Sequence, residues 1–317
     1  MLTLQTGMSV CSIDGRVEMI ITKLLLKHWR VTPSMYRWFL RHCAEGSDYA
    51  QVYRRLQHTG RMDWAALLRD YAYFFWFDTP DFCQQESTII RGIVQDSATD
   101  KHQQQLVSEE TNATLTCRQN AITLLLNGFD SRVMNRGEHN LLVNKGNFSW
   151  LHNLGYDCQI VNVAEGARIA NSGPNCHIDS LGERVRQSNL GNGSTLSCSG
   201  TRSHLINSGM RCHLLSRGDK SRIANVGALS KIQSLGEGVA IANAAGETSI
   251  SAQGDNAIIA SASEVNYVVL GKGGCAALPY FDGRRMRFVT LYEGEAGIQA
   301  GVKYCVDSSG TVCRYPL

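Results

Sequence analysis

Apolar and polar residues between residues 128 and 261 alternate in a frame of nine. Most units begin with Gly, carry a small residue at position four and Ile, Leu or Val at position six, and have Asn or a small residue at position eight. Inward positions four, six and eight predict a short β-strand, and the Gly-x-x before it predicts a turn. A degenerate frame with Leu106, Leu115 and Leu124 at position six extends the repeat back to about residue 100. Units of this kind stack as a solenoid, each burying its apolar edge against its neighbours.

Position eight sets the size of one coil. Intervening units drift toward small residues there, whereas alternate units carry an asparagine every eighteen residues: Asn135, Asn153, Asn171, Asn189, Asn207, Asn225 and Asn243. This spacing predicts about 18 residues per coil, with two strands and two turns, in a two-sheet β-solenoid of about nine coils. Stacked amides can hydrogen-bond from coil to coil, so we expect a structural Asn ladder.

The segment before the repeat has a helical pattern. Apolar residues recur at spacings of three and four from Val17 to about Phe77, and Thr32-Pro33-Ser34 is typical of a helix start. Three to five short helices are predicted, with a further helix near 87–95. The aromatic run 71–77 is either a ligand or partner site or, as we favour, helix packing.

After residue 271 the frame gives way to alternating segments that predict a small β module. Phe281-Asp282-Gly283 and Ser308-Ser309-Gly310 are hairpin signals. Because a solenoid end exposes strand edges, we interpret this module as a cap. The predicted fold class is α+β multidomain: a helical domain over 1–95, a nonapeptide-repeat β-solenoid over 96–270 and a C-terminal β cap over 271–317.

The repeat and the segment that follows it resemble a known family. The sequence 271–278 reads GKGGCAAL and is followed by an acidic-turn hairpin and Val302-Lys303-Tyr304. This pattern resembles a phage- and prophage-associated family of uncharacterised β-solenoid proteins with a small C-terminal β cap. The segment Tyr53 to Leu68 is similar to the helical module that can precede such repeats. The resemblance implies a fold and a mobile-element origin, and it carries no catalytic motif.

Composition and terminal sequence indicate the cellular compartment in which the protein is expected. The chain has 317 residues and a net charge of +3, which is too small to imply a nucleic-acid binder by itself. Eleven cysteines without CxxC pairs favour a reducing compartment. The N-terminus lacks the pattern of a signal peptide, and no apolar run is long enough to cross a membrane. We therefore expect a cytoplasmic protein without an integral membrane segment, with export without a signal peptide left open.

Known solenoid chemistries do not fit the repeat. Its coils have no insertions, and its acidic residues are scattered over different positions, so no catalytic cleft is predicted. Calcium-binding nonapeptides need an Asp in each unit and glycines at three positions, which this repeat lacks. His177, His204 and His213 occupy position five and are expected on the solvated surface. The prediction is therefore a protein that is not an enzyme and has no cofactor or metal.

One pattern goes beyond what stability requires. With eighteen residues per coil, one column on a single sheet is formed by Arg168, Arg186, His204 and Arg222, and a second, two positions earlier, by Arg184, Arg202 and Lys220. Stacked cations repel one another, so these seven residues are a candidate anion-binding face. The alternative is a tolerated basic surface offset by Glu165, Glu183 and Asp219. Aromatic residues between the cations are expected to be missing, which argues against single-stranded nucleic acid.

The prediction for function is a non-enzymatic scaffold or interaction protein of phage or bacterial origin. A protein partner is expected, with an anionic polymer or surface as a further candidate and homo-oligomerisation open. One alternative is an effector or toxin whose activity lies in the helical domain, with the solenoid as its targeting arm. Another is nucleic-acid binding through the Arg column.

Overall fold

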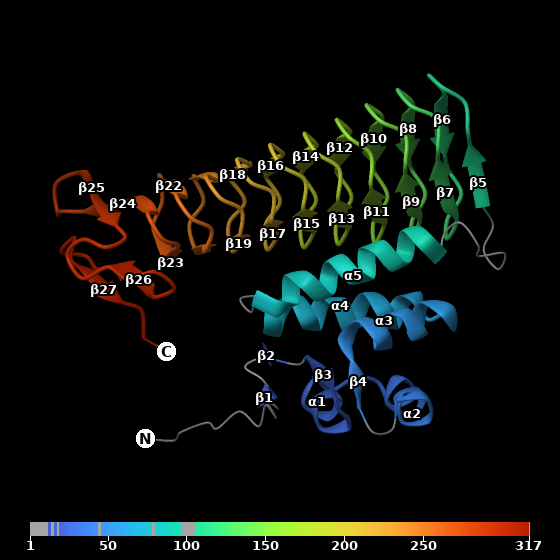
Figure 1. The fold of residues 1–317 in the computed structure, drawn as a ribbon, viewed down its shortest axis with the longest axis horizontal. Helices are drawn as coiled ribbons and strands as arrows, with labels where there is room; N and C mark the ends of the chain where they lie inside the picture. Colours follow the sequence, from blue (N-terminus) through green and yellow to red (C-terminus); the bar gives the residue numbers. More distant parts are fainter. Residues whose placement is uncertain are drawn as a thin grey trace. The chain divides into compact units, whose positions relative to one another are not determined.

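The computed structural model describes residues 12–13, 16–17, 19–43, 46–77, 80–96 and 105–316. The chain divides into two compact units, Met1–Gln95 and Asp96–Leu317. The first consists mainly of helices, and the second is the expected β-solenoid followed by a small group of C-terminal strands (Figure 1). The predicted fold class is therefore confirmed.

The described residues of unit 1 form five helices and two short strand pairs. The helices are α1 (Lys23–His28), α2 (Pro33–His42), α3 (Tyr49–His58), α4 (Met62–Trp76) and α5 (Pro80–Asp96), and the strands are β1 (Ser12–Ile13), β2 (Arg16–Val17), β3 (Ile20–Ile21) and β4 (Ser47–Asp48). Thr32 caps α2 as predicted, because its hydroxyl accepts a hydrogen bond from the Met35 amide. The helix predicted near 87–95 begins earlier, at Pro80.

A buried ion pair holds α3, α4 and α5 of this unit together. Arg69 donates two hydrogen bonds to Glu86 Oε2, at 2.9 and 2.5 Å, and both side chains are 1% exposed. Tyr49 and Tyr73 also donate their hydroxyls to Glu86. Hydrogen bonds that satisfy a buried carboxylate offset much of its desolvation cost.

The described aromatic residues near the end of α4 pack within unit 1. Trp29 stacks on Tyr71 with ring centroids 5.0 Å apart, and Tyr73 and Phe77 are each 1% exposed. Tyr73 also meets Phe82 edge-on. These contacts favour the packing interpretation of the run over a ligand site.

Unit 2 is built from two sheets, which we name sheet A and sheet B. Sheet A contains β6 (Thr114–Cys117), β8 (Arg132–Asn135), β10 (Trp150–Asn153), β12 (Arg168–Asn171), β14 (Arg186–Asn189), β16 (His204–Asn207), β18 (Arg222–Asn225), β20 (Ala240–Asn243), β22 (Ile258–Ser261), β24 (Cys275–Phe281) and β25 (Met286–Tyr292). Sheet B contains β5 (Gln105–Ser108), β7 (Thr123–Leu126), β9 (Leu141–Asn144), β11 (Gln159–Asn162), β13 (His177–Ser180), β15 (Thr195–Cys198), β17 (His213–Ser216), β19 (Lys231–Ser234), β21 (Thr248–Ala252), β23 (Val265–Leu270), β26 (Lys303–Val306) and β27 (Val312–Arg314).

The parallel register repeats every eighteen residues, as the asparagine spacing predicts. Trp150 pairs with Arg168 in sheet A, and Gln159 pairs with His177 in sheet B. The solenoid has about ten coils rather than about nine, because β23 and β24 still pair in parallel with β21 and β22. The frame is weak in this last coil, so the repeat pattern alone does not reveal it.

The first position of the repeat is Gly because the coils touch there. A Cβ atom added at Gly200 would lie 1.8 Å from the Gly182 carbonyl oxygen of the coil before, and one at Gly182 would lie 1.9 Å from the Ala164 oxygen. At position three the backbone turns into the left-handed region, with φ of 54° at both Arg184 and Arg202. The corners are therefore set by backbone contact.

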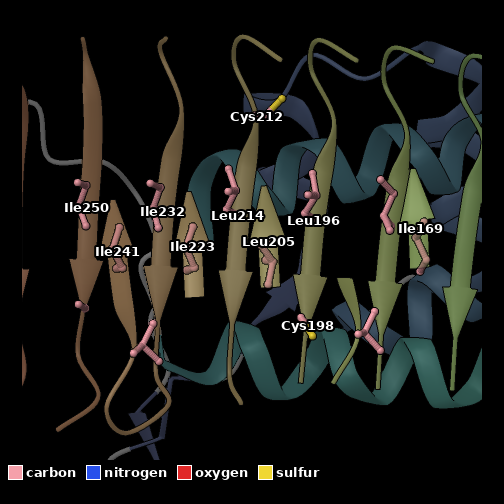
Figure 2. Close-up of a cluster of buried hydrophobic side chains, with 14 of the residues drawn as sticks. Ile169, Leu196, Cys198, Leu205, Cys212, Leu214, Ile223, Ile232, Ile241 and Ile250 are labelled. Carbon is pink, nitrogen blue, oxygen red and sulfur yellow. The ribbon is translucent and has the colours of Figure 1, made fainter. Parts of the chain in front are cut away.

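A thin apolar core lies between the two sheets. Side chains at position six point inward from facing strands, as Figure 2 shows for Leu205 and Leu214, which are both fully buried. Gln187 interrupts this row and is 1% exposed. Its amide donates to Ser180 Oγ at 2.8 Å and to the Ser197 carbonyl at 3.0 Å.

Two hairpins form the C-terminal strand region, at the places where the sequence signals lie. β24 and β25 pair antiparallel around Asp282, and β26 and β27 pair antiparallel around 307–311. Asp282 accepts hydrogen bonds from the amides of Arg284 and Arg285, which fix the first turn and, with Arg287, lower the pKa of this carboxyl to about 2.

Candidate functional site: the outer face of sheet A

Outward side chains of sheet A come from positions five and seven of the repeat. Position five of β6 to β22 carries, in order, Thr114, Arg132, Trp150, Arg168, Arg186, His204, Arg222, Ala240 and Ile258, and position seven carries Thr116, Met134, His152, Ala170, Ser188, Ile206, Ala224, Ala242 and Ala260. Over these nine described strands the outward positions include four arginines and no Asp, Glu or Lys. In its Arg, Trp and Met and its lack of Lys, Asp and Glu, though not in its five alanines, this composition resembles the centre of a protein interface.

The position-five column begins two coils earlier than the sequence analysis placed it. Trp150 pairs in register with Arg132 on one side and Arg168 on the other. The guanidinium carbons of these arginines lie 5.7 and 4.5 Å from the indole centre. No Phe, Tyr or Trp intervenes between Arg168 and Arg222, as expected from the sequence, but Trp150 lies directly beside the first of these cations. Arginine against an indole face is a favourable cation–π contact, so Trp150 separates two cations that would otherwise repel.

The remaining cations of the column lie directly against one another. Arg168 pairs with Arg186, which pairs with His204, which pairs with Arg222. Burial, together with the charges of Arg186 and Arg222, lowers the pKa of His204. Among the described residues no carboxylate forms an ion pair with Arg168, Arg186 or Arg222. The carboxylates that could offset the positive charge of this column, Glu165, Glu183 and Asp219, lie at the corners before the strands.

A shallow groove of about 600 Å³ runs along the same face, from β6 to β16. Ala170 and Ser188, the smallest side chains at its centre, form the floor. The wall on the position-five side includes Trp150 and Arg186, and Ile206 closes one end. Trp150 is 46% exposed and Ile206 48% exposed. The groove thus combines apolar surface with guanidinium groups along one wall.

The second predicted column lies at the corner before each sheet A strand. Arg184, Arg202 and Lys220 have left-handed backbone there. They share a hollow of about 410 Å³ with Glu183, Thr201 and Asp219, and Arg184 forms an ion pair with Glu165. The structure therefore divides the seven predicted anion-binding residues between an acid-free face and a corner of mixed charge. The offsetting acids belong to the corner, so the face is the stronger candidate.

The asparagine ladder lies at the opposite end of the sheet A strands, where it holds the following corner. Each amide donates to the next in line, as in Asn171 Nδ2 to Asn189 Oδ1 at 2.7 Å and Asn189 Nδ2 to Asn207 Oδ1 at 2.8 Å. The same amides donate to corner carbonyls, such as that of Gly191 at 2.8 Å. The ladder bonds cover all seven residues from Asn135 to Asn243. These asparagines are buried, so they are not available to a ligand.

The histidines differ from the expectation of a solvated surface. His177 lies on β13 in sheet B, where all four residues of the strand are buried. The expectation that His177 is solvated is therefore wrong. On β17, burial and then Lys231 lower the pKa of His213 to about 3. His204 is half-buried on the outer face of sheet A. His152, on the groove wall, was not singled out, although it lies two residues after Trp150.

Within the described part of the chain, no three His, Cys, Asp or Glu side chains gather in a way that could hold a metal ion. The described cysteines are free thiols. The described helices include none with the length and apolar character needed to span a membrane.

Comparisons with known proteins concern mainly unit 1. Residues 19–77 match the YdhT N-terminal domain family. Over 99 residues the chain is 34% identical to the "Uncharacterized protein YdhT" of Escherichia coli (strain K12), a stretch that covers 31% of this chain and 37% of that relative. The family match includes the segment 53–68, whose sequence resembles a helical module that can precede such repeats. No solved structure matches the chain.

Proposed function

We propose that this chain is a non-catalytic interaction protein that binds an anionic partner through the outer face of sheet A. The observation that carries the proposal is the column of Arg168, Arg186, His204 and Arg222 on a face without a carboxylate. Stacking cations at the ~4.8 Å spacing of strands costs electrostatic free energy, so folding alone does not favour the column. An anionic partner would relieve that repulsion on binding.

The test is binding of the full chain to immobilised dextran sulfate, measured by surface plasmon resonance over a range of salt concentrations. The double variant Arg168→Glu/Arg186→Glu is expected to bind at least tenfold more weakly and with a smaller salt dependence. The matched control is Arg284→Glu/Arg285→Glu, which changes the net charge equally at an exposed hairpin. Equal loss in both variants, or none in the first, would overturn the proposal.

Single-stranded nucleic acid is the second candidate partner. An exposed aromatic side chain in the basic column, Trp150, favours it, since such sites combine a basic path with aromatic side chains. An oligothymidylate that binds with an affinity that falls steeply with salt, and that loses affinity when Trp150 is replaced by Ala, would support this candidate.

A phage or bacterial setting is part of the same proposal. It is supported by the resemblance of the repeat and the C-terminal strands to a phage- and prophage-associated family. The test is the genomic neighbourhood of the gene. Adjacent phage structural genes would support the setting, and a neighbourhood of metabolic genes in related genomes would overturn it.

A further inference from the structure

The dimensions of the groove restrict what it can hold. It crosses six strands from β6 to β16, so it is about 24 Å long at the ~4.8 Å spacing of parallel strands. A volume of about 600 Å³ over this length leaves a mean cross-section of about 25 Å². An α-helix with side chains is ~10–12 Å wide, which is wider than a groove of this section. The groove is therefore the size of one extended chain.

The spacing of the cations distinguishes between extended chains. In a peptide strand, side chains on one side recur every ~6.6 Å, which falls out of step with the ~4.8 Å column within two coils. A pyranose ring in an extended polysaccharide advances the chain by close to one strand spacing. Acidic sugars can therefore place about one charge opposite each coil of the groove, whose wall includes Arg132, Arg168 and Arg186.

The environment of Trp150 argues against stacked bases. Guanidinium groups reach its ring from the strands on either side, at 5.7 and 4.5 Å from the ring centre, so the indole offers its exposed edge rather than a free face. Single-stranded nucleic acid gains much of its affinity from bases stacked on aromatic faces. A sugar needs no such face here, because its C–H groups can pack on the small floor of Ala170 and Ser188.

We propose that this groove binds an unbranched acidic polysaccharide that lies along the solenoid axis, with about one charged sugar per coil. Carboxylate or sulfate groups accept hydrogen bonds from Arg168 and Arg186, and the apolar ring faces lie on Ala170 and Ser188 beside Trp150 and Ile206. The assignment rests on the proposed function and specifies its partner.

The experiment is isothermal titration calorimetry of the full chain at physiological salt. The probes are oligogalacturonates, alginate oligomannuronates and heparin-derived oligosaccharides of graded length, compared with polyglutamate and oligothymidylate of equal charge. At least one glycan series is expected to bind at least tenfold more tightly than both comparison polymers. Its affinity is expected to rise with length and level off near about six sugars, the number of strands that the groove crosses.

Two variants separate charge from shape. Ala170→Phe fills the floor and leaves every charge in place, so glycan affinity is expected to fall at least tenfold while the weaker, charge-dependent binding of polyglutamate persists. Arg186→Glu is expected to weaken both. Thermal unfolding checks that each variant remains folded. Ser172→Phe, a half-buried position two residues further along the chain and outside the groove, is the size-matched control and is expected to leave both kinds of binding unchanged.

The outcomes distinguish the two proposals. If polyglutamate or oligothymidylate binds as tightly as every glycan, and binding still depends on Arg186, the polysaccharide assignment is overturned and the anion-binding function stands. An unchanged glycan affinity in Ala170→Phe also overturns the assignment. If no polyanion binds, both proposals fall.

Discussion

The guanidinium carbon of Arg168 lies 4.5 Å from the ring centre of Trp150, its in-register neighbour on the preceding coil of sheet A. On its other side Arg168 pairs with Arg186, another cation. One arginine thus has an aromatic neighbour and a like-charged neighbour, both at the spacing of adjacent strands. On the Trp150 side the charge of Arg168 is stabilised by a cation–π contact, whereas on the Arg186 side it is repelled by a like charge. Both contacts lie beside the centre of the groove.

Replacing Trp150 by Ala tests whether the indole compensates the column. We expect the free energy of unfolding of the variant to lie within about 1 kcal/mol of that of the parent, because exposed cation–π contacts contribute ~0.5–1 kcal/mol. The loss of the groove wall is expected to weaken binding of the anionic probe about tenfold. Urea unfolding and calorimetric titration measure the two effects. A loss of several kcal/mol without weaker binding would make Trp150 a packing residue.

Replacing Gly200 by Ala tests the close contact between coils. The new Cβ would lie 1.8 Å from the Gly182 carbonyl oxygen, so the coils must separate locally. We expect the free energy of unfolding to fall by at least about 3 kcal/mol, as for other overpacked sites. Gly246→Ala is the matched control, since a Cβ there meets no atom within 4 Å. Similar stabilities of the two variants in urea unfolding would contradict the model of backbone contact.

Replacing Asn189 by Ala interrupts the ladder at its centre. Asn171 Nδ2 then loses one of its acceptors, Asn207 Oδ1 keeps only the bond from the Gly209 amide, and the Gly191 carbonyl keeps only the bond from the Cys212 thiol. Because losing hydrogen bonds of buried groups costs ~1–3 kcal/mol each, we expect a loss of at least about 3 kcal/mol in chemical unfolding.

The control for the ladder is Asn192→Ala. Asn192 lies on the exposed corner and accepts one bond, from the Met210 amide at 2.8 Å. Its replacement is expected to cost less than about 1 kcal/mol, since water can take the place of the amide. Equal costs at Asn189 and Asn192 would contradict a ladder whose effect depends on burial.

The sequence was sufficient for the solenoid and not for the site. Gly at position one and Asn at position eight contact the equivalent residues of neighbouring coils, eighteen residues away. Both residue types are visible in the sequence, so the register could be predicted. Trp150 was missed because the column was started at Arg168, although Arg132, Trp150 and Arg168 already have the same spacing. The burial of His177 was not predictable, because the repeat gives both sheets the same inward and outward alternation. The groove depends on Ala170 and Ser188, whose small size matters only once their neighbours across strands are known.

The lowered pKa of His204 predicts a pH dependence of binding. Burial and the charges of Arg186 and Arg222 keep the imidazole neutral at pH 7. As the pH falls below the ordinary histidine value of ~6.5, the unfolded chain takes up the proton first, so His204 contributes a loss of stability on acidification. At still lower pH the folded protein also protonates, which adds a positive charge to the face and strengthens anion binding.

A bound anion offsets the neighbouring arginine charges and raises the pKa of His204, so binding below about pH 6.5 is expected to take up protons. Titration calorimetry in two buffers of different ionisation enthalpy measures this uptake. His204→Gln is expected to reduce it, whereas His139→Gln, at a corner where His139 lies beside Asp157, is expected to leave it unchanged. Proton uptake that survives in His204→Gln at its full extent would show that the linked group lies elsewhere on the protein.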